Sequence, residues 1–222
     1  MSKDQFLIVA IDGGAASGKS STSRGLRDRF GLMRVDTGSF YRSITLKLLE
    51  AGIEAQSNAK LNQALEKMEL ETEIESGDAM ISIDGWTPDE SIRSERINHS
   101  VSDYAALPEI RERLLQYQRN QKDVAQENGY SGLIMEGRDI GSVIFPDANV
   151  KLFLDASPEA RASRRAKEGI VDSMEKRDRI DSTRKTAPLK RPEGSILIDS
   201  SEMSLEEVID EAAKYIEAAL NS

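Results

Sequence analysis

The sequence predicts an α/β protein whose core is a five-stranded parallel sheet flanked by helices. Two observations lead to this fold class. Short apolar runs alternate with amphipathic helical segments along most of the 222 residues, which is the pattern of a parallel sheet with helical crossovers. A glycine-rich motif also stands between the first apolar run and the first helical segment, where strand–loop–helix units of this class bind phosphate.

Each predicted strand is a short apolar run bounded by polar or turn residues. The five runs cover residues 6–11, 32–35, 133–135, 150–154 and 196–198. Helices are expected at residues 20–30, in the segment from Tyr41 to the stop at Gly52, at 97–106, at 108–128, after Ser157 and after Ser204. Pro108 and Pro158 suit the first position of a helix, and Ser204 with Glu207 has the spacing of a capping box.

The alternation of strands and helices is interrupted between residues 57 and 97. A short helix with Leu61, Leu65 and Met68 is followed by two strand-like runs, 70–74 and 80–83, which a turn joins. We interpret residues 57–97 as a small α+β insertion between two strands of the sheet. The rest of a single domain of residues 1–222 is then a core of residues 1–56 and 98–222.

The composition favours a protein of a reducing compartment. The sequence has no cysteine, which excludes disulfides, thiolate metal sites and cysteine nucleophiles. No apolar run has the length of a signal-peptide core or a membrane span, so we expect a cytoplasmic monomer without a membrane partner. The net charge of −9 argues against broad binding to nucleic acid.

The charge is unevenly distributed along the chain. Residues 161–191 hold eleven basic and five acidic residues, a local charge of +6 in a chain of −9. Such polarity suggests a site for a small, highly charged anion. Arg161, Arg164 and Arg165 could instead cover a helix face, and we expect this of at least one of them.

Residues 13–20 match the phosphate-loop motif G-x-x-x-x-G-K-S of nucleoside-triphosphate enzymes. Glycines let the loop turn its backbone N–H groups inward, and the N-terminus of the following helix adds to this anion site. Lys19 supplies a positive charge for the outer phosphates, and the hydroxyl of Ser20 suits Mg²⁺. The residues expected to bind ATP are Gly13, Gly14, Ala15, Ala16, Ser17, Gly18, Lys19, Ser20 and Ser21.

Polar clusters follow two of the other predicted strands. The first is Asp36–Thr37–Gly38, with Arg42 about one helical turn later, and the second is Glu136–Gly137–Arg138–Asp139. The carboxyl ends of parallel strands form the ligand site of an open sheet, so both clusters are expected near the phosphate loop. Taken alone, Arg42 could equally be a solvated helix charge. The Arg138–Asp139 pair could be a surface pair, but Gly137 and Gly141 bracket it, which suggests a close approach of the backbone instead.

The chemistry that fits these residues is phosphoryl transfer to a second phosphate. The transition state spreads charge over the equatorial oxygens of the transferred group, and arginines suit those oxygens well. An acceptor phosphate is already ionised, so it requires no general base. No histidine or convincing carboxylate base is found near the phosphate loop.

Several motifs together resemble bacterial cytidylate kinases over nearly the whole chain. The most specific are Gly137–Arg138–Asp139–Ile140–Gly141 and the R-D-x-x-D-x-x-R pattern from Arg177 to Arg184. The resemblance implies a nucleoside-monophosphate kinase that transfers the γ-phosphate of ATP to CMP or dCMP, with Mg²⁺ as cofactor. It further implies that residues 57–97 are the enlarged nucleotide-monophosphate-binding region of the bacterial form.

The same resemblance assigns roles to individual residues. Cytosine would be faced by Ser102, Arg111 and Asp139, because a carboxylate accepts from the N4 amine that uracil lacks. The phosphate or sugar of CMP would be held by Thr37, Arg42, Arg138 and Arg184, and the ribose by Arg177 and Asp181. The catalytic residues would be Lys19, Arg165, Arg177 and Arg184, with Arg165 and its neighbours in a short lid, residues 157–184, over ATP.

Three features depart from the family. The stretch between Arg165 and Arg177 is shorter than expected, which leaves open which lid arginines reach the γ-phosphate. Gly14 stands where the family often has proline, and Ser39–Phe40 replaces a small and aliphatic pair. None of these touches the residues expected to contact the base.

Two other functions are compatible with a phosphate loop. One is a kinase for another acceptor, such as UMP, AMP or a small alcohol, which Asp139 and Arg111 facing the acceptor would count against. The other is a nucleotide switch. A GTPase would contain the guanine-binding pattern N-K-x-D, which this sequence lacks.

Overall fold

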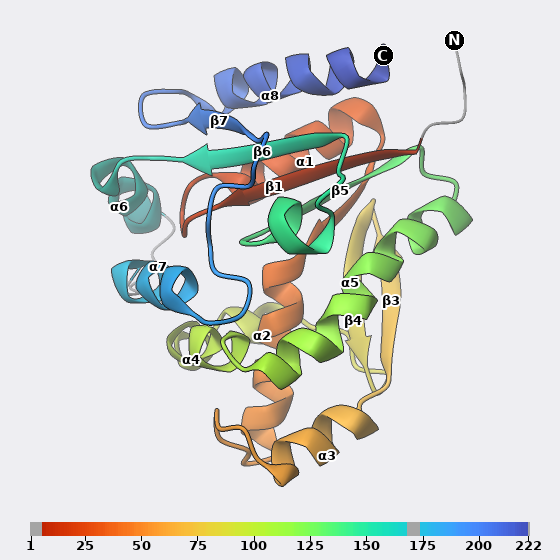
Figure 1. Cartoon of the computed structure of the whole chain (residues 1–222), viewed down its shortest axis with the longest axis vertical. Coiled ribbons are helices and arrows are strands. Elements are labelled where there is room, and N and C mark those ends of the chain that lie inside the picture. The colour runs from red at the N-terminus through yellow and green to blue at the C-terminus, as the bar shows by residue number, and fades with distance from the viewer. Residues whose placement is uncertain (1–5, 168–173, 222) are drawn as a thin grey trace.

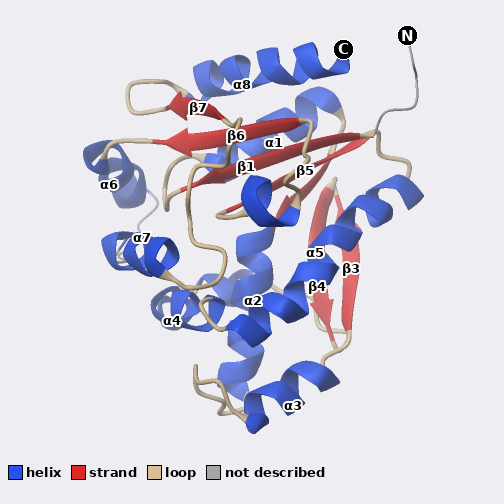
Figure 2. Ribbon diagram, in the orientation of Figure 1, coloured by secondary structure: helices blue, strands red, loops and turns tan. Residues whose placement is uncertain are grey.

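The computed structural model describes residues 6–167 and 174–221. Its centre is one twisted sheet with helices on both faces (Figure 1, Figure 2). The strands are β1 Leu7–Gly13, β2 Met33–Asp36, β3 Leu70–Glu75, β4 Asp78–Ile83, β5 Gly132–Gly137, β6 Val150–Asp155 and β7 Ile196–Asp199. They lie in the order β3-β4-β2-β5-β1-β6-β7.

The five predicted strands all form, and they pair in parallel as β2-β5-β1-β6-β7. The predicted strand count of five is wrong, because the sheet within the described residues has seven strands. The hairpin of β3 and β4 is part of the same sheet. β4 pairs with β2 in parallel through Arg34 and Val35, and β3 pairs with β4 in antiparallel register. The hairpin thereby covers the edge of β2, which would otherwise expose unpaired backbone groups.

The helices are α1 Lys19–Phe30, α2 Thr37–Glu50, α3 Ala59–Lys67, α4 Glu95–Ala105, α5 Pro108–Glu127, α6 Pro158–Lys167, α7 Met174–Thr183 and α8 Leu205–Leu220. The predicted capping box begins α8, since Ser204 and Glu207 bond to each other's backbone N–H. Pro108 and Pro158 are the first residues of α5 and α6, as predicted. None of the helices described is long and apolar enough to cross a membrane.

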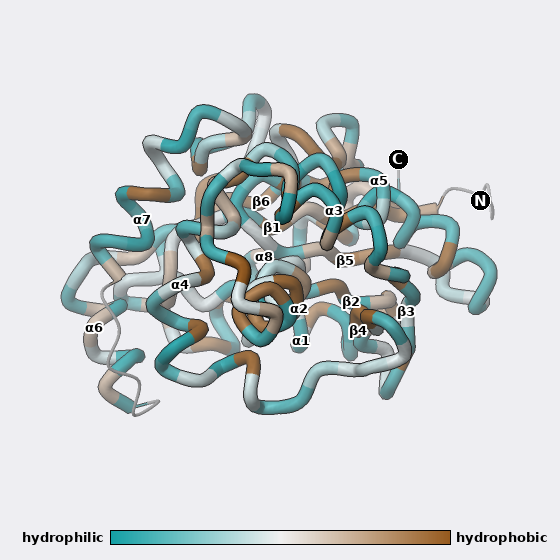
Figure 3. Tube along the Cα trace, turned by 90° about the horizontal axis from the view of Figure 1, so that it is seen from below, coloured by the Kyte–Doolittle hydropathy of each residue, from teal (hydrophilic) through white to brown (hydrophobic). Residues whose placement is uncertain are grey.

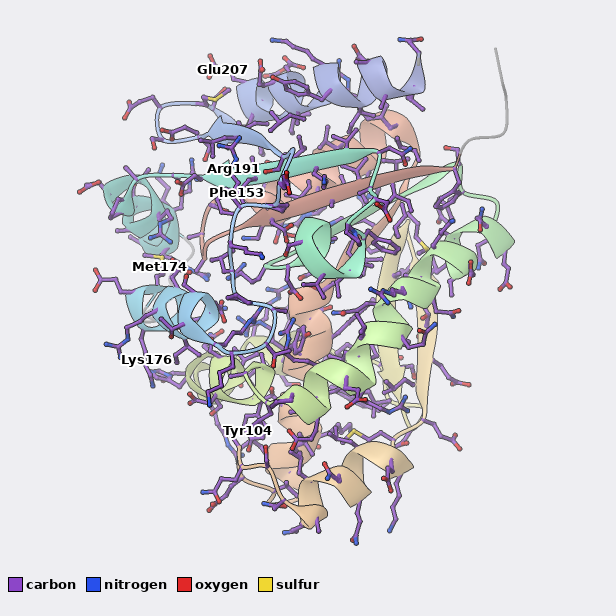
Figure 4. The ribbon with its side chains drawn as sticks, viewed as in Figure 1. Tyr104, Phe153, Met174, Lys176, Arg191 and Glu207 are labelled. Carbon is purple, nitrogen blue, oxygen red and sulfur yellow. The ribbon has the colours of Figure 1, made fainter. Side chains whose placement is uncertain are left out.

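Two apolar clusters fill the space on the two faces of the sheet. Alternate residues of β1 contribute to opposite faces: Ala10 belongs to the cluster under α2, α4 and α5, whereas Val9 and Ile11 belong to the cluster with α1 and α8. Tyr104 of α4, labelled in Figure 4, donates its hydroxyl to the carbonyl of Ile53 at 2.6 Å, which ties α4 to the chain after α2.

Helices α6 and α7 lie together at one side of the molecule and are largely hydrophilic (Figure 1, Figure 3). They belong to the predicted lid of residues 157–184, of which 168–173 lie outside the described residues. No residue of α6 is fully buried, and Asp181 is the buried residue of α7. These two helices are therefore held by polar contacts, and those contacts reach the phosphate loop.

Candidate active site

A cavity of about 770 Å³ opens at the carboxyl ends of β1, β2 and β5. One side of it, called the loop half below, is formed by residues 15–21 and Arg24. A second part of the lining, called the arginine half, includes Arg42, Arg93, Arg165 and Arg177. The two halves come from segments far apart in the chain, which the parallel sheet brings to one edge.

The phosphate loop has the shape that its glycines predict. A Cβ atom on Gly13 would lie 2.1 Å from the carbonyl oxygen of Leu154, and Gly18 has φ 94°. Neither position therefore accommodates an ordinary side chain. Since α1 begins at Lys19, the loop ends on the positive N-terminus of a helix, which favours an anion.

Lys19 is buried and folded onto its own loop. Its Nζ atom donates to the carbonyls of Gly13 at 2.9 Å and Gly14 at 2.6 Å. Burial is the largest of the effects that lower the pKa of Lys19, and repulsion from Arg138 adds to it. An anionic phosphate in the cavity would reverse that effect, because a nearby negative charge stabilises the ammonium form.

Glu136, at the carboxyl end of β5, organises the polar groups behind the loop. Its two carboxylate oxygens accept from Ser20 Oγ and Ser23 Oγ, each at 2.8 Å, and from Arg34 at 2.5 Å. Burial raises the pKa of Glu136, and the nearby carboxylate of Asp36 adds to this effect. Ser20, the predicted magnesium ligand, thus lies beside a buried carboxylate whose charge a cation would stabilise.

Arg42 shows how charge is concentrated in the arginine half. It is buried, and its guanidinium donates to the carbonyl of Ile92 at 3.0 Å and to Asn98 Oδ1 at 2.7 Å. Burial lowers the pKa of Arg42 to about 9, and repulsion from Arg177 and Arg93 adds to this shift. Several guanidinium groups are therefore close enough to destabilise one another, and a dianion between them would relieve that repulsion.

A chain of ion pairs leads from the arginine half to the deepest part of the site. Arg138 Nε contacts Asp181 at 3.0 Å, and Arg184 lies 3.7 Å from the other oxygen of Asp181. Arg184 then contacts Asp139 Oδ1 at 3.3 Å, and Arg111 contacts Asp139 Oδ2 at 2.5 Å. All five side chains belong to the predicted set, and the fold brings them together.

Arg111 differs from its partners because it does not line the cavity. Its second guanidinium nitrogen, NH1, donates to the carbonyl of Ala105 at 3.1 Å, and its guanidinium lies 5.3 Å from the ring centroid of Tyr41. The buried Arg111 therefore stands behind Asp139 and holds one of its oxygens. In this arrangement, Asp139 and Ser102 are the predicted base-contacting residues that line the cavity.

Thr37 begins α2 at the junction of the two halves. Its hydroxyl donates to the carbonyl of Glu136 at 2.8 Å. A Cβ atom on Gly137 would lie 2.6 Å from Thr37 Oγ1, so the absence of a side chain at position 137 is what allows this close approach.

Sequence reasoning missed some residues of the site. Arg93, from the 3-10 turn Glu90–Arg93, lines the arginine half and lies 3.5 Å from Asp36. Asn98 of α4 positions Arg42. Neither residue belongs to a recognisable motif, and Arg93 lies in the 57–97 insertion, whose position beside the cavity depends on tertiary packing.

The lid helices contact the outer turn of the phosphate loop. Asp178 of α7 accepts from the backbone N–H of Ala15 at 2.9 Å and pairs with Arg161 of α6. Arg161 and Arg164 donate to the carbonyls of Ala15 at 3.1 Å and Ala16 at 3.3 Å. The neighbours of these residues in sequence, Arg165 and Arg177, line the cavity instead.

Comparison with known proteins yields matches over nearly the full length. The family model described as cytidylate kinase matches residues 9–218. A cytidylate kinase of Nocardia farcinica is 37% identical over 97% of this chain and 96% of its own length. One of Pelotomaculum thermopropionicum is 38% identical over 93% of this chain and 94% of its own.

Solved structures support the fold alone. An unliganded sugar kinase of Janibacter has a TM-score of 0.52 at 16% identity, with 96% of this chain and 95% of that chain covered. The protein TT1252 of Thermus thermophilus has a TM-score of 0.50 at 17% identity, with 98% of this chain and 99% of that chain covered.

Proposed function

The chain belongs to the cytidylate kinase family, and we propose that its cavity binds ATP and CMP face to face for direct phosphoryl transfer. The enzyme is a CMP kinase, which converts ATP and CMP or dCMP to ADP and CDP or dCDP. The observation that carries the assignment of sites is the cavity itself. It joins a phosphate loop to a buried carboxylate, Asp139, through a cluster of arginines.

ATP is assigned to the loop half. Its phosphates would accept from the inward N–H groups of residues 13–21 and from Lys19, which exchanges the carbonyls of Gly13 and Gly14 for phosphate oxygens. This exchange replaces neutral acceptors with charged ones, which form the stronger hydrogen bonds.

CMP is assigned to the arginine half. Its phosphate would lie among Thr37, Arg42, Arg138 and Arg184, with the ribose near Arg177 and Asp181. At neutral pH this phosphate is largely a dianion, so its oxygen attacks the γ-phosphorus of ATP without a base. Arg165 and Arg177 line the same cavity, and we assign to them and to Arg184 the stabilisation of the charge that develops on the transferred group.

Cytosine is assigned to the end of the cavity at Asp139 and Ser102. Arg111 and Arg184 each bond to one oxygen of Asp139, which keeps the carboxylate oriented as an acceptor for the N4 amine of cytosine. Uracil presents a carbonyl oxygen there, and two acceptors repel each other. We further propose that Arg111 orients Asp139, and the direct contact of Arg111 with the base that the resemblance implies stays a prediction.

The residues present fit Mg²⁺. Among the described residues no cluster of three or more histidine, cysteine, aspartate or glutamate side chains could hold a metal alone. Magnesium that binds with a nucleotide takes most ligands from phosphate and water, and Ser20 beside the buried Glu136 supplies the protein's part. When bound, the ion neutralises phosphate charge. We also propose that the enzyme is a monomer and is located in the cytoplasm. Light scattering of the purified protein measures the oligomeric state.

An acceptor panel tests the function. ADP release is measured with ATP, Mg²⁺ and CMP, dCMP, UMP, AMP or no acceptor. We expect the highest kcat/KM with CMP or dCMP and a clear preference over UMP. In Asp139→Asn one acceptor oxygen becomes an amide NH₂, and the CMP/UMP ratio should fall by about 10- to 100-fold because a hydrogen bond to a charged group contributes about 1.5–3 kcal/mol.

The panel separates the possible failures. No ADP release above the acceptor-free rate with CMP would exclude a CMP kinase. An unchanged CMP/UMP ratio in Asp139→Asn would leave the enzyme a CMP kinase but remove Asp139 as the residue that selects the base. Lys214→Met, an exposed substitution on α8, controls for general effects of mutation.

A further inference from the structure

Asp12 is a buried carboxylate between the two halves of the site to which the proposed reaction assigns no role. It is the residue of β1 immediately before Gly13, where the phosphate loop starts, and its side chain is fully buried. Its two oxygens bond to a segment that lies far away in the chain. Oδ1 accepts from the backbone N–H of Ile140 at 2.7 Å, and Oδ2 from that of Gly141 at 2.8 Å.

The two N–H groups belong to the turn that immediately follows Asp139. This turn is a short π-helix, Ile140–Ile144, in which the carbonyl of Asp139 accepts from Val143 and Ile144. The first N–H groups of any helix lack partners within it. Asp12 provides both acceptors from a different strand, so the backbone on the carboxyl side of Asp139 is fixed to β1.

Asp139 is therefore held from two sides. Arg111 and Arg184 hold its side-chain oxygens, and Asp12 holds the peptides that follow it. Asp12 is bonded covalently to Gly13 of the phosphate loop, and it is hydrogen-bonded to the two residues that follow the base-contacting Asp139. A bidentate contact of this kind restrains rotation as well as distance.

A buried carboxylate is costly unless it is well hydrogen-bonded. Burial raises the pKa of Asp12 to about 6, with a smaller contribution from Asp139, while the two N–H groups and Lys19 oppose the rise. Above that value the two N–H groups face an ionised acceptor, which forms a stronger bond than a neutral one.

We propose that Asp12 is a positioning residue that sets the placement of the base-contacting loop relative to the phosphate loop, and thereby of CMP relative to ATP. The inference rests on the proposed function, because it takes the loop half as the ATP site and Asp139 as the cytosine contact. In-line transfer tolerates little misplacement, and a shift of about 1 Å can cost about 100-fold in rate.

Asp12→Asn tests the proposal with almost no change in shape. One of its side-chain atoms still accepts, but its NH₂ group faces the N–H of Ile140 or Gly141. We expect kcat with CMP to fall about 10- to 100-fold and the CMP/UMP ratio of kcat/KM to fall several-fold. ATP affinity, measured from the shift of melting temperature with ATP concentration, should stay within about threefold.

The control is Asp155→Asn, the same substitution at an exposed strand end. Asp155 ends β6, beside β1, and its side chain accepts from the backbone N–H of its own neighbour Ala156 at 2.9 Å. This control should retain kcat and the CMP/UMP ratio. A lower melting temperature of Asp12→Asn with unchanged kcat and an unchanged ratio would show a merely structural residue and overturn the proposal.

Hydrogen–deuterium exchange of the wild-type protein keeps the test decisive if Asp12→Asn does not fold. The amides of Ile140 and Gly141 should exchange slowly, and ATP alone should slow them further, because it restrains the loop that begins at Gly13. No effect of ATP on a peptide containing residues 140 and 141 would overturn the proposal. Failure of the wild-type protein to phosphorylate CMP would instead reject the function on which the proposal rests.

Discussion

The two halves of the cavity differ in how their charged groups interact with the rest of the chain. In the loop half the polar groups have partners within the chain: Lys19 bonds to Gly13 and Gly14, Ser20 bonds to Glu136, and the N–H of Ala15 bonds to Asp178. In the arginine half, burial lowers the pKa of Arg42, and repulsion from Arg177 and Arg93 adds to the shift. Both halves exchange internal contacts for a ligand, but in the second half an anion also relieves repulsion between guanidinium groups.

This difference matters for the order of events in catalysis. A cluster of positive charge attracts an anionic acceptor from a distance, although the acceptor then competes with the contacts of Arg42 to Ile92 and Asn98. The loop half is preformed in shape by Gly13 and Gly18, but its lysine has to turn from carbonyl oxygens to phosphate oxygens. The comparison therefore predicts that substitutions in the two halves have different effects on activity and on stability.

Loss of Lys19 should have the largest effect. Lys19→Met keeps an unbranched side chain but removes the charge for the outer phosphates. We expect kcat to fall by ~10³-fold or more, which corresponds to about 4 kcal/mol of transition-state stabilisation. The fold should remain, because the ammonium group bonds only to oxygens of its own loop. Steady-state ADP release measures the change, and activity within tenfold of wild type would show that the loop half does not bind the transferred phosphate.

Two buried arginines should differ sharply in their effect on stability. Arg111→Met removes the nearer arginine partner of the buried Asp139 and leaves Arg184 at 3.3 Å, and a buried acceptor that loses its partner costs about 1–3 kcal/mol. Arg42→Met also loses two hydrogen bonds, but it relieves burial of a charge and repulsion from Arg93 and Arg177. Its free energy of unfolding should therefore change much less.

Denaturant unfolding of both variants without nucleotide measures this contrast. CMP should stabilise Arg42→Met less than wild type, because a phosphate contact is lost. Equal destabilisation by the two substitutions would mean that the arginine half is not strained by its own charge, and the comparison between the halves would fail.

The parts of this picture that the sequence predicted are the local ones. A run of apolar residues, a phosphate-loop motif and a Ser204–Glu207 capping box each depend on neighbours in sequence, and the five core strands and the capping box are found where they were expected. The clustering of Asp36–Arg42 with Glu136–Asp139 also followed, because parallel strands end at one edge.

What the sequence did not predict depends on contacts between distant segments. Nothing in residues 70–83 indicates that β4 pairs with β2, so the strand count was too low. The contacts of Arg111 with Asp139 and Tyr41 also join distant segments, while its contact with the base stays a prediction. The two contacts of Asp12 join residues more than a hundred positions apart, and no local pattern signals them.

The smallest predicted effect concerns the contact between the lid helices and the loop half. Asp178 places a negative charge on the outer turn of the phosphate loop, where it accepts from the N–H of Ala15. A polyphosphate bound to that loop would be repelled by this carboxylate. Asp178→Asn keeps an acceptor for Ala15 but removes the charge, so the KM for ATP should fall about two- to fivefold, the size of a partly exposed charge interaction.

Glu175→Gln is the matched control, because Glu175 is an exposed acidic residue in the first turn of the same helix. It removes the same charge from α7 and should leave the KM for ATP unchanged at moderate salt, where exposed charges are screened. A KM that rises in Asp178→Asn would show that the paired Arg161 and Asp178 support ATP binding. In that case the internal contacts of the loop half help to form the ATP site and do not compete with ATP. The two halves would then differ only in the repulsion between the guanidinium groups of the arginine half.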